Sequence, residues 1–174
     1  TTQSEDDFVT YAVISTNSLK AGESTLQSVQ LLVINRTQGT GSLVSIPTDV
    51  YAQVDGGAKT LADIYKDSGQ SACVTALVSA TNIKISHVII ATDDVWEKIS
   101  ALSDSGARSL VSNASDLLSS MVTDMKPNQL LELAEIVQPI GISNLEHVDA
   151  PVVEGSNGPA IDTTALGKLV GILV

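Results

Sequence analysis

The sequence predicts a single α/β domain with three layers, α/β/α, in which a central mixed β-sheet is flanked by helices. Segments with the apolar patterns of strands alternate with segments of helical spacing. Residues 85–91 form a nearly continuous apolar run, which is typical of a strand covered on both faces. The 174 residues suffice for one domain with its own core.

The first half of the chain is predicted to be mainly strands. Gly39 and Gly41 lie in a turn after the second strand, so the second and third strands are expected to form a hairpin. Gly56 and Gly57 mark another tight turn. In chain order we expect strands at 8–14, 29–35 and 43–46, a short helix at 59–65, and a longer helix carrying Val74, Leu77, Val78 and Thr81.

The second half is predicted to be mainly helical. Thr92, Asp93 and Asp94 are residues that commonly cap a helix N-terminus, although Asp93 and Asp94 also resemble a catalytic carboxylate pair. After the strand at 85–91 we expect a helix carrying Val95, Ile99 and Leu102, a helix with one apolar stripe from Leu110 to Met121, a helix beginning near Pro127, a strand at 145–153 interrupted by Pro151, a loop at 154–159, and a final helix carrying Leu166 to Leu173.

The charge of the chain excludes several classes of partner. Acidic residues outnumber basic residues by 20 to 9, and the formal net charge is -11. Long-range repulsion of phosphates argues against nucleic-acid binding and against docking on an anionic membrane surface. One cysteine, Cys73, permits no internal disulfide and is expected to be buried. With only His87 and His147 beside it, a zinc site is not expected.

The ends of the chain give a further expectation. Residues 1–7 are polar and are predicted to be a disordered or linker start, so the domain is expected to span residues 8–174. No transmembrane run or signal peptide is visible. The chain begins without Met, so we expect it to be part of a longer protein, with room for a signal or membrane anchor before Thr1.

The stretch from Ser42 to Tyr51 points to a site. It reads as a buried strand that stops at Pro47 and brings Thr48 and Asp49 to its carboxyl end. Ligands of α/β sheets bind outside the carboxyl ends of the strands. Asn17 follows the first strand and is expected to face the same edge if the two strands run parallel.

The order of these motifs resembles the LytR-CpsA-Psr family, also called the cell-envelope-related transcriptional attenuator domain. The sequence carries Leu-Val-Ile-Asn at 32–35 and Ser-Ile-Pro-Thr-Asp-Val-Tyr at 45–51, where the family has a strand ending in Ile-Asn and then Ser-Ile-Pro-Arg-Asp-Thr. Lys-Thr-Leu-Ala-Asp-Ile-Tyr at 59–65 and Ile-Ser-His-Val-Ile at 85–89 follow in the family's order. The resemblance covers residues 8–102 best.

The resemblance implies an extracytoplasmic, cell-envelope-associated protein. Members of the family attach glycopolymers to peptidoglycan from a polyprenyl-pyrophosphate carrier, with arginines on the pyrophosphate and aspartates on magnesium. It implies a polyprenyl-phosphate lipid or a wall polymer as the partner, and no nucleic acid. It does not indicate an oligomeric state.

The chain departs from the family at the residues that would do this chemistry. Asn17 stands where the family has its first aspartate, and Thr48 stands for an arginine. The arginine and aspartate of Arg-Ser-Asp-Thr fall near Thr25 and Gln27. A central segment of the family also looks deleted after residue 102. Asp49, Lys59, Asn17 and Thr48 are therefore predicted as ligand-binding residues, and no catalytic or metal-binding residue is assigned.

Each assignment has an alternative. Asp49 is either a surviving ligand, in which case magnesium becomes an option, or a turn residue that caps local backbone after Pro47. Lys59 either approaches a phosphate or is a solvated lysine at a helix start. His87 is expected to be packed rather than catalytic.

Three functions compete on this reading. The preferred one is a degenerate, non-catalytic member that binds a polyprenyl-phosphate lipid, a wall component or a protein partner. The alternative is an active phosphotransferase that moves glycopolymer from its carrier to peptidoglycan. A transcription regulator, as the older family name suggests, fits worst, because the chain is acidic and shows no basic recognition helix.

Overall fold

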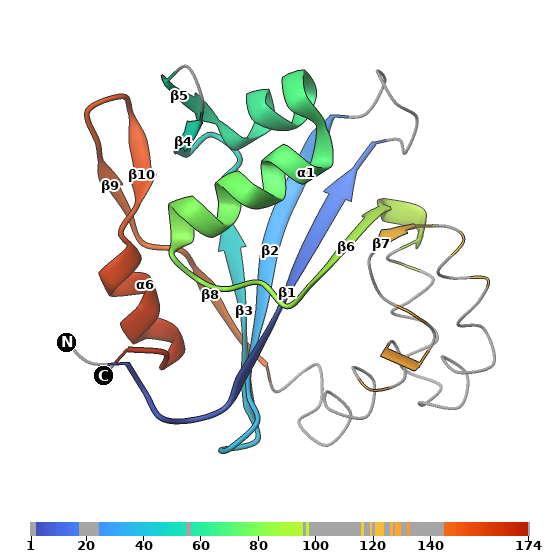
Figure 1. Cartoon of the computed structure of the whole chain (residues 1–174), viewed down its shortest axis with the longest axis vertical. Coiled ribbons are helices and arrows are strands. Elements are labelled where there is room, and N and C mark those ends of the chain that lie inside the picture. Colours follow the sequence, from blue (N-terminus) through green and yellow to red (C-terminus); the bar gives the residue numbers. More distant parts are fainter. Residues whose placement is uncertain are drawn as a thin grey trace.

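The fold is seen in a computed structural model, which describes most of the chain outside its central part. Its elements are coloured along the sequence in Figure 1. The described residues are 3–17, 25–54, 57–95, 97, 116, 119, 121–123, 126, 128–129, 132 and 145–173.

A six-stranded mixed sheet forms the centre, in the order β7-β6-β1-β2-β3-β8. Strands β6, β1, β3 and β8 run in one direction, and β2 and β7 run in the other. This confirms the predicted α/β class with a mixed sheet. The strands are β1 (Phe8–Thr16), β2 (Leu26–Asn35), β3 (Thr40–Ile46), β6 (His87–Thr92), β7 (Val122–Thr123) and β8 (Glu146–Asp149).

The strands β1, β2 and β3 form a meander, in which the hairpin of β2 and β3 was predicted from the turn residues between them. Asn35 pairs with Phe8 on one side and with Thr40 on the other, so one register runs across the three strands. Gly39 has a φ of 67° in the tight turn between β2 and β3, a conformation in which glycine carries no steric penalty. Since β1 and β3 are both antiparallel to β2, they end at the same edge of the sheet.

Helix α1 (Leu61–Thr81) covers one face of the sheet (Figure 1). The two helices expected here follow one another within α1 and are separated at Gly69, whose φ of 88° and ψ of -175° are not helical. Before α1, the strands β4 (Tyr51–Val54) and β5 (Gly57–Thr60) form a hairpin that was not predicted from the sequence. Lys59 therefore lies on β5, and its placement at a helix start was wrong.

The core lies between α1 and the sheet. Aliphatic side chains alternate along the strands toward this face, and α1 adds a stripe of large side chains. Aromatic residues make up only 3% of the chain, so aliphatic packing supplies most of the burial. Among the described residues of this core, the largest fully buried side chains are Ile14, Leu31, Leu61, Ile64, Leu77, Ile90 and Leu166.

The C-terminal part has more strands than the sequence indicated. Pro151 divides the predicted strand at 145–153 into β8 and β9 (Val152–Glu154), because proline cannot continue a ladder. The loop predicted at 154–159 is confirmed at residues 155–158, which connect β9 to β10 (Pro159–Ile161) in a hairpin. The final helix, α6 (Thr163–Val170), starts after the capping residue Asp162, earlier than the apolar pattern suggested.

The two ends of the described chain lie together (Figure 1). Gln3 forms a bridge with Leu173, and the Ser4 N–H donates to the Ile172 carbonyl at 2.7 Å. Strand β1 begins at Phe8, where the domain was expected to begin. The boundary between a linker and the domain stays a prediction, with Thr1 and Thr2 outside the described residues.

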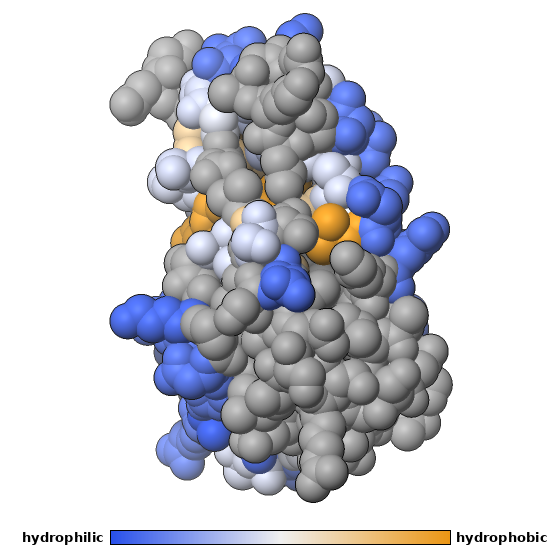
Figure 2. All heavy atoms as spheres, turned by 90° about the vertical axis from the view of Figure 1, so that its right-hand side faces the viewer, coloured by the Kyte–Doolittle hydropathy of each residue, from blue (hydrophilic) through white to orange (hydrophobic). Residues whose placement is uncertain are grey.

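Most of the helices predicted for residues 95–137 lie outside the described residues, so the third layer of the sandwich stays a prediction. Met121, expected on a helix, is instead followed directly by strand β7. Figure 2 looks toward the β6 and β7 edge of the sheet and shows hydrophobic residues at mid-height among hydrophilic ones. Among the described residues, no helix combines the length and the apolar character needed to cross a membrane.

Candidate binding site at the carboxyl edge of the sheet

The carboxyl ends of β1, β3, β6 and β8 meet at one edge of the sheet, which we call the carboxyl rim. Thr16 pairs with Thr92, and Ser45 pairs with Asp149, so these residues mark the level of the rim. Three of the four predicted ligand-binding residues, Asn17, Thr48 and Asp49, follow strands that end here. The expectation that Asn17 and Asp49 face the same edge is confirmed in the strand directions.

Asn17 has a structural partner. Its side-chain Oδ1 accepts a hydrogen bond from the Thr25 N–H at 2.7 Å, and its own N–H donates to the Thr25 carbonyl at 3.4 Å. These contacts close the connection between β1 and β2. The amide is exposed, but one of its acceptor sites is used within the protein.

Thr48 and Asp49 form the turn between β3 and β4, next to the start of helix α1. The Thr48 carbonyl accepts from the Ala62 N–H at 3.1 Å, and the Val50 carbonyl accepts from the Leu61 N–H at 3.2 Å. The backbone of this turn therefore caps the start of α1. The Asp49 carboxylate is exposed, and among the described residues no hydrogen bond or ion pair engages it.

The first N–H groups of helix α1 are thereby occupied. Thr60 is the N-cap, and its Oγ1 accepts from the Asp63 N–H at 3.2 Å. A helix N-terminus binds anions through free N–H groups that carry the positive end of the helix dipole. Because carbonyls and a hydroxyl of the protein already accept from Leu61, Ala62 and Asp63, this helix start offers little to a phosphate.

Among the described residues, no hydrogen bond or ion pair joins Lys59 to the Asp49 carboxylate. Its Nζ lies 3.4 Å from Oδ2 of Asp67 on α1. The two side chains are 47% and 52% exposed, so this ion pair adds little stability in water. The pair nevertheless gives the Lys59 ammonium a partner within the protein, in place of the phosphate that was considered for it.

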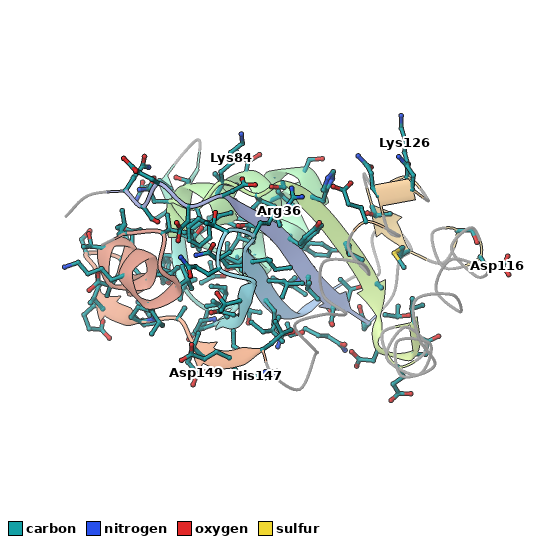
Figure 3. The ribbon with its side chains drawn as sticks, turned by 90° about the horizontal axis from the view of Figure 1, so that it is seen from below. Arg36, Lys84, Asp116, Lys126, His147 and Asp149 are labelled. Atoms are coloured by element: carbon teal, nitrogen blue, oxygen red, sulfur yellow. The ribbon has the colours of Figure 1, made fainter. Side chains whose placement is uncertain are left out.

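Other rim residues carry further carboxylates. The Thr92 hydroxyl donates to the Asp94 carboxylate after β6, so at least Asp94 has a local structural role. Asp149 ends β8, and Figure 3 shows it with His147 on the side of the sheet away from α1. Asp149 was not predicted as a site residue. Its position shortly before Pro151 could have indicated a residue at the end of a strand.

The described residues do not form a cluster of three or more metal ligands. Magnesium demands near-octahedral oxygen ligands, usually with at least one or two carboxylates beside phosphate and water. No three acidic, histidine or cysteine side chains of the described part converge on one point. Asp49 remains as the one described carboxylate at a position that the family uses, and Asn17 provides an amide instead of a second.

Tyr11 and His87 stack on the same face of the sheet as Asp149, farther from the rim. Their ring centroids are 5.8 Å apart, with 24° between the planes. Burial is the main cause that raises the pKa of the Tyr11 hydroxyl. The Glu132 carboxylate raises this pKa further, and Arg36 lowers it. Tyr11 is only 3% exposed, so the pair is a packing contact in the lower sheet.

Cys73 is buried, as predicted, and burial raises the pKa of its thiol to about 11. The thiolate is the reactive form, so we expect iodoacetamide to label native Cys73 far more slowly at pH 8 than the same chain in urea. Because the folded pKa lies above the unfolded value, this residue's contribution to stability is present at neutral pH and lost as pH rises through about 11. Equal labelling rates in the two states would contradict the burial of this thiol.

No protein-family model matches the sequence, and no curated protein matches it. Solved structures do match in fold. TagV from Bacillus subtilis has a TM-score of 0.71 at 11% identity, and the transcriptional regulator yvhJ from the same organism has 0.69 at 13%; each match covers 95% of both chains. YwtF (TagT), a LytR-CPS2A-psr family protein with bound octaprenyl pyrophosphate lipid, has 0.56 at 13% over 97% of this chain and 92% of its own.

These neighbours settle the architecture. Identities of 11% to 13% are too low to carry a function, but the matches extend over almost the whole chain. The resemblance read from the motifs at 32–35, 45–51 and 85–89 is therefore confirmed in the fold. The expected deletion after residue 102 lies outside the described residues. The chain has the fold of the LytR-CpsA-Psr proteins.

Proposed function

We propose that this chain is an extracytoplasmic, cell-envelope-associated domain that serves glycopolymer assembly by binding and does not catalyse transfer. Its ligand would be a polyprenyl lipid, a wall component or a protein partner. One observation carries the proposal. At the rim of a LytR-CpsA-Psr fold, Asn17 and Thr48 replace charged residues of the family, and Asn17 and Lys59 already have partners inside the protein.

Transfer from a pyrophosphate carrier depends on charge. Phosphoryl transfer is largely positioning and electrostatic stabilisation, and arginine forks hold the phosphate oxygens in two-pronged contacts. Removing one such stabilising donor costs roughly 2.7–4 kcal/mol where it has been measured in other active sites. Losing an arginine and an aspartate together would remove most of the rate enhancement, while the fold stays intact.

An active phosphotransferase is the second candidate. Two observations favour it: YwtF, which has the same fold, holds octaprenyl pyrophosphate, and the Asp49 carboxylate here is exposed and unengaged among the described residues. A transcription regulator is supported by less. The neighbour yvhJ is described as a transcriptional regulator, which is the observation in favour of this function. Against it, a chain with a net charge of -11 repels the phosphates of DNA.

The test is mass spectrometry of lipid extracted from the protein after purification from a bacterial host, together with a glycopolymer transfer assay. We expect a polyprenyl lipid in the extract and no transfer above the rate without protein. Transfer that falls more than tenfold in Asp49→Asn, but not in the matched exposed-carboxylate variant Asp63→Asn, would establish the phosphotransferase instead. An extract without lipid, combined with no transfer, would leave only a wall polymer or protein partner.

A further inference from the structure

The face of the sheet opposite α1 changes character toward the carboxyl rim. At the end of the sheet away from the carboxyl rim, the side chains of Tyr11, Leu32 and Ile34 are buried. One row nearer the rim, Gln30 pairs with Val13 on one side and with Ser45 on the other, and all three are only half-buried. Solvent therefore reaches the middle of the sheet at this level.

Four uncharged polar side chains line this part of the face, and we call them the polar band. They come from the three central strands β1, β2 and β3, and Ser15 pairs directly with Ser28. Ser28 is exposed and the others are half-buried. Among the described residues, no hydrogen bond engages any of the four side chains. The polar band consists of Ser15, Ser28, Gln30 and Ser45.

The described charges at the carboxyl ends of β3 and β8 are negative. Asp149 pairs with Ser45 at the strand edge, and Asp49 follows β3 three residues beyond Ile46. The one lysine at a family position, Lys59, pairs with Asp67. The N–H groups at the start of α1 are occupied by the turn after β3. A diphosphate at this edge would meet carboxylates, and the Lys59 ammonium is already paired with Asp67.

We infer that the polar band binds an uncharged, hydroxyl-bearing group and that it does so without a divalent cation. Serine hydroxyls and the Gln30 carboxamide both donate and accept hydrogen bonds, which matches the hydroxyls of a sugar or of a free lipid alcohol. Neither partner brings a charge that must be desolvated. This inference rests on the proposed binding function and names the chemistry of its ligand.

The test is competition between lipids that differ only in the head group. The full chain in detergent micelles receives equal amounts of octaprenol and octaprenyl diphosphate, once with Mg²⁺ and once with EDTA, and native mass spectrometry counts the complexes. We expect octaprenol complexes to exceed diphosphate complexes by about tenfold in both solutions, which corresponds to about 1.4 kcal/mol. Chitotetraose in detergent-free solution tests a soluble sugar as the source of the same hydroxyls.

A variant ties the result to the polar band. Gln30→Leu keeps the side chain's bulk and removes its amide, so we expect octaprenol binding to fall by about three- to tenfold, the worth of one hydrogen bond. The matched control is Gln53→Leu on β4, whose glutamine is exposed and outside the six-stranded sheet, and it should leave binding unchanged. Far-ultraviolet circular dichroism checks that both variants fold.

Each outcome bears on a different claim. Diphosphate bound as well as octaprenol, or bound better with Mg²⁺, would overturn the inference and leave the proposed binding function standing. Binding of chitotetraose alone would support the inference with a glycan as the ligand. Equal loss in both glutamine variants would remove the polar band from the site. No binding of any of the three probes would overturn the inference and the lipid and glycan forms of the proposed function together.

Discussion

Leu61→Ala is expected to lower the free energy of unfolding by about 2–5 kcal/mol, because it empties a fully buried position that cannot collapse easily. Leu61 is 0% exposed in the core cluster. Its N–H also donates to the Val50 carbonyl, so the same residue holds the turn of Thr48 and Asp49 against the helix. Urea denaturation followed by circular dichroism measures the loss.

The matched control for this prediction is Leu169→Ala on helix α6. Leu169 is 43% exposed, so the same deletion of side-chain atoms leaves no internal cavity. Surface substitutions of this kind usually change stability by less than about 0.5 kcal/mol. Similar losses in both variants would show that Leu61 is not packed between α1 and the sheet as described.

Gly158→Ala is expected to cost about 2–4 kcal/mol, because two penalties coincide at this position. Its φ of 139° is outside the range that residues with a Cβ adopt readily. A Cβ at Gly158 would also lie 2.5 Å from the ring of Tyr51 on β4. The substitution should therefore separate the β9–β10 hairpin from β4, and thermal unfolding of the variant measures the combined cost.

Two further variants separate the penalties. Gly39 also has a positive φ, 67°, but a Cβ there would meet nothing within 4 Å. Gly39→Ala should therefore cost only about 1–2 kcal/mol, from backbone conformation alone. In a Tyr51→Ala background the contact penalty at Gly158 should vanish. If Gly158→Ala were as mild as Gly39→Ala, the close packing on Tyr51 would be refuted.

Local chemistry explains why much of the sheet could be predicted. The turn after Asn35 carries Gly39 where a positive φ is needed, and the β-branched runs on both sides fit the pleated surface. Pairing of β2 with β3 depends on residues close in the chain. The burial of Cys73 and of residues 89–91 likewise followed from their apolar surroundings.

The predictions that failed concern a short hairpin and an ion pair between neighbouring segments of the chain. The strands β4 and β5 have no apolar alternation to show them, and they form because they pair with each other beside α1. Lys59 was placed on a helix because the residues that follow it are helical. Its ion pair with Asp67 requires the helix to turn back along β5, which residue spacing alone does not reveal.

The sequence by itself determined the α/β class, the β2–β3 hairpin, the family resemblance and the rim position of Asn17, Thr48 and Asp49, because these depend on local pattern and strand order. Only the tertiary structure decided how the candidate residues are engaged. Asn17 closes a loop and the turn after β3 caps helix α1. Such hydrogen bonds depend on where distant backbone atoms come to lie, and composition and spacing do not encode that distance.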